Sequence, residues 1–163
     1  MNAIVAVDQK WGIGKDGCLL ATIPGDLKYF KQMTMGKVIV MGRATFDTLP
    51  GKKPLPGRIN IVLSRDPDFQ PDCIVCRSME DLYKELEAYD PEDIYIIGGQ
   101  SVYNIMLDCC KRILITKIEQ TCVADCHFPN LDLQQDWELV SEGERYEEAG
   151  VSYRFTEYKR REE

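Results

Sequence analysis

Short apolar runs rich in β-branched residues recur along the chain, and each run is typical of a β-strand. Residues 94–97, Ile-Tyr-Ile-Ile, form one such run without a polar break. Strands of this kind are usually buried on both faces, as they are in a parallel sheet. The pattern predicts six strands, at residues 2–7, 37–41, 58–63, 73–76, 93–97 and 112–118.

Helical patterns lie between several of these strands. The segment 25–34 follows Thr22 and Pro24, which together are typical of a helix start. Residues 78–89 begin with Ser78 as an N-cap and Asp81 at the third helical position. Two further helices are predicted, at residues 43–49 and 101–108. Because single helices separate successive strands, we expect a mostly parallel, doubly wound sheet.

The C-terminal part has a different pattern. Residues 137–146 and 151–160 alternate around the turn at 147–150, which predicts an antiparallel hairpin at the edge of the sheet. The 163 residues, 1–163, then form a single α/β domain with an eight-stranded sheet and about four helices. Three loops rich in glycine, proline and charge are candidates for ligand binding, at residues 8–23, 50–57 and 66–72.

Composition is that of an ordinary soluble protein. Hydrophobic residues make up 44% and charged residues 29% of the chain, and no apolar run is long enough to span a membrane. The N-terminus lacks the basic head of a signal peptide, so we expect a cytoplasmic protein. The seven cysteines are an odd number, which favours reduced thiols.

A metal site is not expected. Cys73 and Cys76 have the spacing of a zinc or redox pair, but no second pair at ligand spacing accompanies them, and His127 is the only histidine. These two cysteines are better interpreted as small buried hydrophobic residues. The single histidine also leaves little room for a serine-hydrolase triad, since no Gly-x-Ser-x-Gly motif is present.

Charge divides the chain into two parts. The net charge is −7, which argues against nucleic acid or an anionic membrane as a partner. Residues 1–77 nevertheless carry 11 basic and 7 acidic residues, a net charge of +4, whereas the remainder carries −11. The first part can therefore contain a local pocket for a small anionic ligand.

Two predicted strand ends lead through glycine into a helix. The first passes through Gly42 to Arg43, and the second passes through Gly98 and Gly99 to the helix that starts near Ser101. Glycine allows a close approach of the backbone, and a helix start offers unpaired N–H groups. Together the two junctions could hold a pyrophosphate, although neither matches Gly-x-Gly-x-x-Gly and each could simply turn the chain.

Other polar residues follow strand ends on the same rim. Ser64 and Arg65 come after the third strand, and with Arg43 they offer a hydroxyl and two guanidinium groups to a phosphate. Arg77, after the fourth strand, could stack on a flat ring. The alternative is that these arginines are only solvated surface residues.

Asp26 is the acidic residue that stands out. It shares a helix face with Phe30 and Thr34 and adjoins Leu27, and a carboxylate on an apolar face is costly without a partner. A ligand with an amidine-like pair of donors would supply one. The alternative is an aspartate that only stabilises the start of its helix.

These features together resemble the dihydrofolate reductase family over nearly the whole chain. The resemblance rests on Ile-Pro-Gly-Asp-Leu-Lys-Tyr-Phe-Lys at 23–31 and Val-Met-Gly-Arg-Ala-Thr-Phe at 40–46. It continues with Pro-Leu-Pro-Gly-Arg-Ile-Asn at 54–60, Leu-Ser-Arg at 63–65, Ile-Gly-Gly-Gln-Ser-Val-Tyr at 97–103, Thr116, and Asp-Cys-His-Phe-Pro at 125–129. Each motif is weak alone, but their order along one chain is very specific.

The resemblance implies NADPH-dependent reduction of 7,8-dihydrofolate to tetrahydrofolate, a step that supplies one-carbon metabolism. Hydride would go to C6 of the pterin and a proton to N5. Asp26 would pair with the pterin 2-amino and N3 groups and assist proton supply, and Thr116 would bond to its carboxylate. Arg58 would bind the glutamate α-carboxylate of the substrate. The remaining substrate-binding residues would be Ile4, Val5, Leu27, Phe30, Leu49, Leu55 and Ile97.

The resemblance also assigns the cofactor site. Ala6 and Ile13 would hold the carboxamide, and the two junctions would hold the pyrophosphate. Arg43, Ser64 and Arg65 would bind the 2′-phosphate, and Arg77 would lie beside the adenine. The loop 8–23 would close over the nicotinamide. The implied cofactor-binding set is Ala6, Ile13, Gly42, Arg43, Ala44, Thr45, Leu63, Ser64, Arg65, Arg77, Gly98, Gly99, Gln100, Ser101, Val102 and Tyr103.

The chain departs from the family pattern at two places. Leu20 and Ala21 stand where many members have Pro-Trp, a tryptophan that helps order water near the acid. Ala44 stands where many members have a basic or polar residue, so pyrophosphate binding would rest on backbone amides.

Two other functions remain as alternatives. The first is a related reductase whose pteridine or pyrimidine substrate lacks the glutamate tail, which would leave Arg58 without a purpose. The second is an acidic interaction module with a vestigial nucleotide pocket. For the function implied by the resemblance, we expect a monomer that acts on a small molecule.

Overall fold

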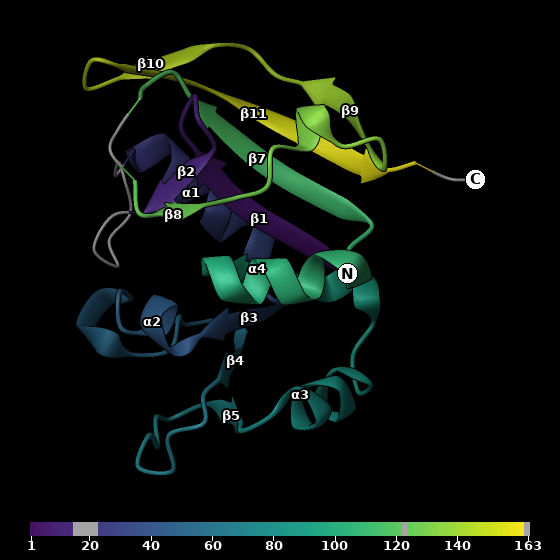
Figure 1. Cartoon of the computed structure of the whole chain (residues 1–163). Helices are drawn as coiled ribbons and strands as arrows, with labels where there is room; N and C mark the ends of the chain where they lie inside the picture. The colour runs from purple at the N-terminus through teal and green to yellow at the C-terminus, as the bar shows by residue number, and fades with distance from the viewer. Residues whose placement is uncertain (15–22, 122–123, 162–163) are drawn as a thin grey trace.

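A single large sheet organises the protein (Figure 1). The computed structural model describes residues 1–14, 23–121 and 124–161. The sheet has the strand order β10-β11-β7-β1-β6-β3-β4-β5, and β9 also pairs with β11. Its strands are β1 (Asn2–Val7), β3 (Val38–Gly42), β4 (Ile59–Leu63), β5 (Ile74–Cys76), β6 (Ile94–Gly98), β7 (Arg112–Ile118), β9 (Trp137–Glu142), β10 (Tyr146–Glu148) and β11 (Val151–Arg160).

The fold class predicted from the sequence is confirmed. Strands β1 and β3 to β7 pair in parallel, and β11 pairs antiparallel with β7. The predicted strand 137–146 is interrupted after Glu142, although Gly143 still donates its N–H to the Phe155 carbonyl of β11 at 2.8 Å. Both pieces pair with β11, and counted as one interrupted strand they give the eight-stranded sheet with its C-terminal hairpin at the edge.

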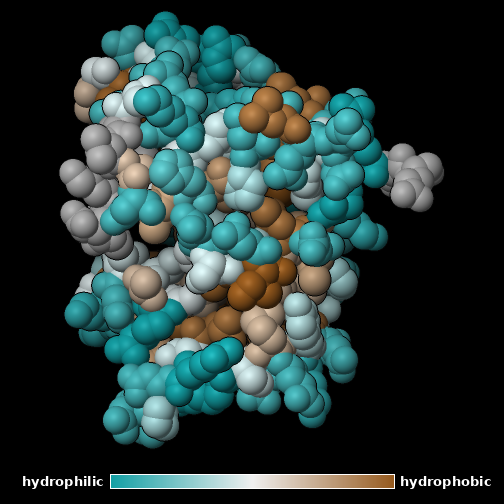
Figure 2. Space-filling model, viewed as in Figure 1, coloured by the Kyte–Doolittle hydropathy of each residue, from teal (hydrophilic) through white to brown (hydrophobic). Residues whose placement is uncertain are grey.

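Within the described residues, four α-helices cover the two faces of the sheet: α1 (Pro24–Thr34), α2 (Arg43–Phe46), α3 (Met79–Leu86) and α4 (Gln100–Met106). Alternate strand residues face opposite sides. Ile94 and Ile96 of β6 pack in one core with residues of α3 and α4, whereas Tyr95 packs in a second core with residues of α1 and α2. Polar side chains cover most of the face seen in Figure 2.

Several boundaries differ from the sequence-based expectation. Helix α2 ends at Phe46 rather than at residue 49, because Pro50 disfavours a helical conformation in the residue before it. A second, small sheet joins β2 (Gly12–Gly14) to β8 (Cys126–His127) and was not predicted, since strands this short show no periodicity. Within the described residues, no helix is long and apolar enough to cross a membrane.

The ladder between β1 and β6 is short. Asn2 pairs with Tyr95 and Ala3 with Ile96, and among the described residues the pairing of these strands stops there. The next carbonyl of β1, that of Ile4, instead accepts a hydrogen bond from the Tyr103 hydroxyl at 2.7 Å. Strand β1 continues along β7 and strand β6 continues along β3. The carboxyl ends of β1 and β6 are therefore the place where ligands are expected in a doubly wound sheet.

Candidate functional site

Asp26 and Thr116 form a hydrogen-bonded pair, as the sequence predicted. Asp26 lies in the first turn of α1, which Pro24 begins. Thr116 is buried in β7, opposite Ala6 of β1, and its hydroxyl donates to Asp26 Oδ1 at 2.7 Å. Burial raises the pKa of the Asp26 carboxyl, and the bond from Thr116 offsets only part of this effect. The carboxyl therefore keeps its proton at a higher pH than an ordinary aspartate.

An apolar wall adjoins this pair. Phe30, Leu49, Leu55 and Ile97 are partly buried and pack on the same core, to which the side chain of Ile4 also belongs. The structure thus brings together most of the residues expected to contact the substrate. Two differ from this set. Leu27 is 47% exposed. Val5 packs in the opposite core, so only its backbone faces the wall.

Arg58 lies at the far end of α1. Its Nη1 donates to Thr34 Oγ1 at 3.2 Å, and its Nε donates to the Pro56 carbonyl at 3.1 Å. The guanidinium is partly buried, and burial lowers its pKa. Across the described parts of the chain, no carboxylate forms an ion pair with it. A partly buried cation without an anionic partner is suited to binding an anionic ligand.

The two glycine junctions lie side by side, because β3 and β6 are neighbours in the sheet. A Cβ built on Gly42 would lie 3.1 Å from Val102 Cγ2. Gly98, with φ +123°, would place a Cβ 3.3 to 3.4 Å from Tyr103 and Thr45. The backbone here is thus open to close approach at positions that a side chain would fill, which fits a group held by backbone amides.

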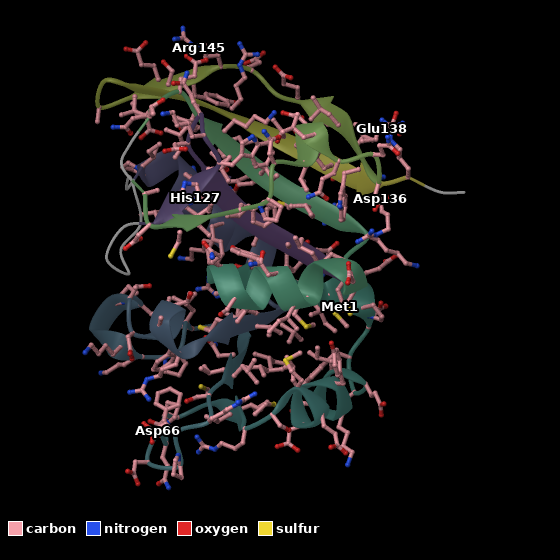
Figure 3. The ribbon with its side chains drawn as sticks, viewed as in Figure 1. Met1, Asp66, His127, Asp136, Glu138 and Arg145 are labelled. Carbon is pink, nitrogen blue, oxygen red and sulfur yellow. The ribbon has the colours of Figure 1, made fainter. Side chains whose placement is uncertain are left out.

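The expected phosphate-binding residues gather around one that the sequence analysis missed, Asp66. Arg43 Nη1 lies 3.3 Å from Asp66 Oδ2, and Ser64 Oγ accepts from the Asp66 N–H at 3.3 Å. Arg77 donates to the Asp66 carbonyl, and it also donates to the Phe69 carbonyl at 2.7 Å. Arg77 therefore braces this loop, which lies at the lower end of Figure 3. In the sequence, Asp66 was recognisable only as the residue that follows Ser64 and Arg65.

The other cofactor-binding residues expected from the sequence are more dispersed. Ala6 pairs with Thr116 across β1 and β7, and Ile13 lies in β2 against the first core. The Gln100 side chain accepts from the His127 N–H at 2.6 Å. Leu63 is partly buried, whereas Ala44, Arg65 and Ser101 are exposed. Residues 15–22 of the expected closing loop, with Leu20 and Ala21, lie outside the described residues.

Two surface cavities lie elsewhere. One, of about 300 Å³, is lined by residues that include Val7, Trp11 and Lys117, and the other, of about 270 Å³, by residues that include Tyr29 and Phe155. Neither is lined by a residue of the expected site. In the described part of the chain, no three histidine, cysteine or acidic residues gather as a metal would require. Cys76 is buried in the first core, and Cys73 packs against the second.

Comparisons with known proteins converge on one family. A family model described as dihydrofolate reductase matches residues 1–160. The dihydrofolate reductase of Bacillus subtilis (strain 168) is 37% identical over 165 residues, which cover 99% of this chain and 95% of that protein. The dihydrofolate reductase of Aedes albopictus is 36% identical over 181 residues, covering 98% and 96%.

A solved structure is similar over the same length. It is the dihydrofolate reductase from Enterococcus faecalis complexed with NADP(H) and RAB-propyl, and it superposes with a TM-score of 0.87 at 33% identity. The match covers 99% of this chain and 96% of that one.

The raised pKa of Asp26 predicts a stability effect. Because burial raises the folded-state pKa above the unfolded value, the stability linked to this group is fully present at low pH and is lost as pH rises through the folded-state pKa. Asn does not titrate and can still accept from Thr116. Asp26→Asn should therefore be more stable than the wild type at pH 7.5, and the gap should shrink toward pH 4. Urea unfolding across this range measures it. A wild type that is the more stable protein at pH 7.5 would contradict the prediction.

Proposed function

The chain belongs to the dihydrofolate reductase family and reduces 7,8-dihydrofolate to 5,6,7,8-tetrahydrofolate with NADPH, and we propose that the residues around Asp26 carry out this reaction. The observation that carries the assignment of roles is the Asp26–Thr116 pair beside the end of the β1–β6 ladder. At this place a buried carboxyl, an apolar wall and a backbone cradle meet.

Asp26 has two tasks in this proposal. Thr116 uses one of the two lone pairs of Oδ1, so both carboxyl oxygens can still accept, and we assign them to the 2-amino and N3 groups of the pterin. The raised pKa lets the carboxyl keep a proton nearer neutral pH, from which it assists protonation of N5, through water. The wall of Phe30, Leu49 and Leu55 packs on the pterin and benzoyl rings and keeps bulk water from the acid.

Helix α1 sets the distance between the two ends of the substrate. Asp26 lies in its first turn, and Arg58 bonds to Thr34 at its last residue. Thr34 lies eight positions after Asp26, which is about 12 Å along the axis at 1.5 Å per residue. This spacing suits a ligand with a flat donor ring at one end and a carboxylate at the other. It therefore supports dihydrofolate over a precursor without the glutamate tail.

The glycine junctions and the rim beyond them suit NADPH. When bound, the cofactor supplies the hydride that reduces C6. We assign its pyrophosphate to the backbone between Gly42 and Thr45 and between Gly98 and Val102. We assign its 2′-phosphate to Arg43, Ser64 and Arg65, and Arg77 acts on this region through the loop it braces. We assign its carboxamide to Ala6 of β1 and Ile13 of β2.

We also propose that residues 1–163 work as one domain, as a cytoplasmic monomer, without nucleic acid or membrane as a partner. The net charge of −7 supports the absence of polyanionic partners. Cys73, Cys76, Cys109, Cys110 and Cys126 are free thiols, which suits a reducing compartment. Analytical ultracentrifugation at micromolar concentration tests the monomer.

Asp26→Asn should abolish most of the activity near neutral pH. An amide cannot supply the proton, so the rate of NADPH oxidation with dihydrofolate should fall about a hundredfold or more at pH 7. Part of the loss should return at low pH, where solvent protonates the substrate directly. Absorbance at 340 nm across pH 5 to 8 measures both effects. A variant with near wild-type activity at pH 7 would remove Asp26 from the mechanism.

Arg58→Leu should weaken the binding of substrates that carry the glutamate tail. A charge-assisted bidentate pair contributes roughly 1.5–3 kcal/mol, so KM for dihydrofolate should rise at least about tenfold. Arg58→Lys should recover only part of this affinity, because lysine lacks the planar fork. The affinity for a pterin without the tail, the internal control, should not change. If the affinity for the pterin without the tail falls equally, Arg58 has a structural role, and the alternative substrate class is favoured.

The double variant Arg43→Gln, Arg65→Gln should reduce the preference for NADPH over NADH. Two exposed charged contacts could separate the cofactors by about a hundredfold in kcat/KM. The double variant should bring the two cofactors close together and flatten the salt dependence of NADPH binding. Arg145→Gln with Arg154→Gln removes the same charge; Arg145 lies on the C-terminal hairpin, far from Asp66 in Figure 3, so this control should keep the preference. A double variant that still strongly prefers NADPH would place the 2′-phosphate elsewhere.

A further inference from the structure

The first turn of α1 is held from the C-terminal hairpin. Ile23, the residue before the helix, offers no side-chain hydrogen bond to it. The capping acceptor comes instead from Glu148, the last residue of β10, whose Oε1 accepts from the Gly25 N–H at 3.1 Å. The same oxygen accepts from the Tyr153 hydroxyl at 2.5 Å. One carboxylate oxygen thus joins the helix start to both strands of the hairpin.

Gly25 is required for this contact. A Cβ built on Gly25 would lie 2.2 Å from Glu148 Oε1 and 2.2 Å from the Tyr153 hydroxyl oxygen. Any side chain would therefore displace the carboxylate or the helix. Tyr153 is buried, pairs with Tyr146 across the hairpin, and stacks on its ring at 5.6 Å. The hydroxyl is therefore presented by a ring that has little freedom to move.

A second contact holds α1 from the same hairpin. The ring of Phe155 stacks on that of Tyr29 with centroids 4.0 Å apart. In the sheet Phe155 lies directly opposite Thr116, the partner of Asp26. Asp26 lies between Gly25 and Tyr29 in the helix. The residue before it therefore contacts β10, through Glu148, and a residue after it contacts β11, through Phe155. The position of Asp26 against Thr116 therefore depends on the hairpin.

We propose that Glu148 is a positioning residue for the reduction: by binding the Gly25 amide and the Tyr153 hydroxyl, it holds the first turn of α1 so that Asp26 stays against Thr116 and the pterin. This inference rests on the proposed role of Asp26. Glu148 itself does not touch the substrate.

Several groups face Asp26 from the elements packed against its helix. Thr116 faces it from β7, Tyr153 from β11 and Tyr29 from its own helix, and the charge of Asp26 acts on both tyrosines. Burial, together with the bond to Glu148 and the nearby charges, raises the pKa of Tyr153 to about 12. Its hydroxyl therefore stays a donor to Glu148 throughout the pH range in which a carboxyl titrates.

Three variants test the proposal. Glu148→Ala removes the acceptor, whereas Glu148→Gln removes the charge and keeps an oxygen that can accept both bonds. Glu147→Ala is the matched control, because this exposed neighbour lies on the same strand and its side chain points to the other face. Hydrogen exchange of the amides at residues 25–28, single-turnover hydride transfer, its pH profile and the Kd for NADPH are measured for each.

In Glu148→Ala, exchange at residues 25–28 should be faster and hydride transfer about tenfold slower at pH 7, since misplacement by about 1 Å can cost up to about a hundredfold. The pH midpoint of the rate should move down, because loosening the turn admits water to Asp26 and burial is the larger cause of its raised pKa. The Kd for NADPH should not change. Glu148→Gln should restore most of the rate and the midpoint, and Glu147→Ala should behave as the wild type.

A different pattern would overturn the proposal. If Glu148→Ala only lowers the melting temperature, with unchanged exchange at residues 25–28, rate and pH midpoint in the folded protein, then Glu148 is structural. If Glu148→Gln is as slow as Glu148→Ala, the charge rather than the capping bond matters, and the proposal is wrong. A wild type that does not reduce dihydrofolate would refute the proposed function instead, and exchange at residues 25–28 would still decide whether Glu148 holds the helix.

Discussion

The site depends on the early end of the ladder between β1 and β6. The carbonyl of Ile4 lies beyond this ladder and accepts from the Tyr103 hydroxyl. Because the ladder ends after Ala3 and Ile96, the carboxyl ends of both strands are available for other partners. Asp26 and Thr116 lie on the β7 side of this break, and the glycine junctions lie on the β3 side. Substrate and cofactor sites are therefore assigned to the two sides of one break in the sheet.

Asp26 and Arg58, at the two ends of α1, are the groups that we propose to orient the substrate. The protonatable Asp26 lies at the start of the helix, and the guanidinium of Arg58, which forms no ion pair within the described residues, bonds to Thr34 at its end. Each group has hydrogen-bonding capacity beyond the bonds given for it, those of Thr116 to Asp26 and of Arg58 to Thr34 and Pro56, and leaving that capacity unused in a partly buried place is costly. A ligand that carries a donor pair at one end and a carboxylate at the other offsets both costs at once, which is a physical basis for its selection. On the cofactor side the situation differs, because the Arg43 guanidinium already has an anionic partner in the Asp66 carboxylate.

The sequence predicted those features that depend on local pattern. The apolar run 94–97 identified a central strand, the neighbours of Asp26 marked it as an unusual acid, and the glycines at 42, 98 and 99 marked the turns into α2 and α4. Features that depend on contacts between distant side chains were missed. Neither the pairing of β2 with β8 nor the contacts of Asp66 and Glu148 leave a periodic or compositional trace. The departure from the family pattern at Leu20 and Ala21 falls on residues that lie outside the described ones.

The bond between Gly25 and Glu148 joins residues 123 positions apart in the chain. Helix α1 is therefore synthesised well before Glu148, the residue that we propose to hold its start. Contacts of such long sequence separation form late, because a large loop must close before they contribute. A growing chain that ends at β7 has every strand of the parallel sheet, yet its acid is still held from one side only. With the role that we propose for Glu148, Asp26 reaches its final position only after the hairpin of β10 and β11 has docked on α1.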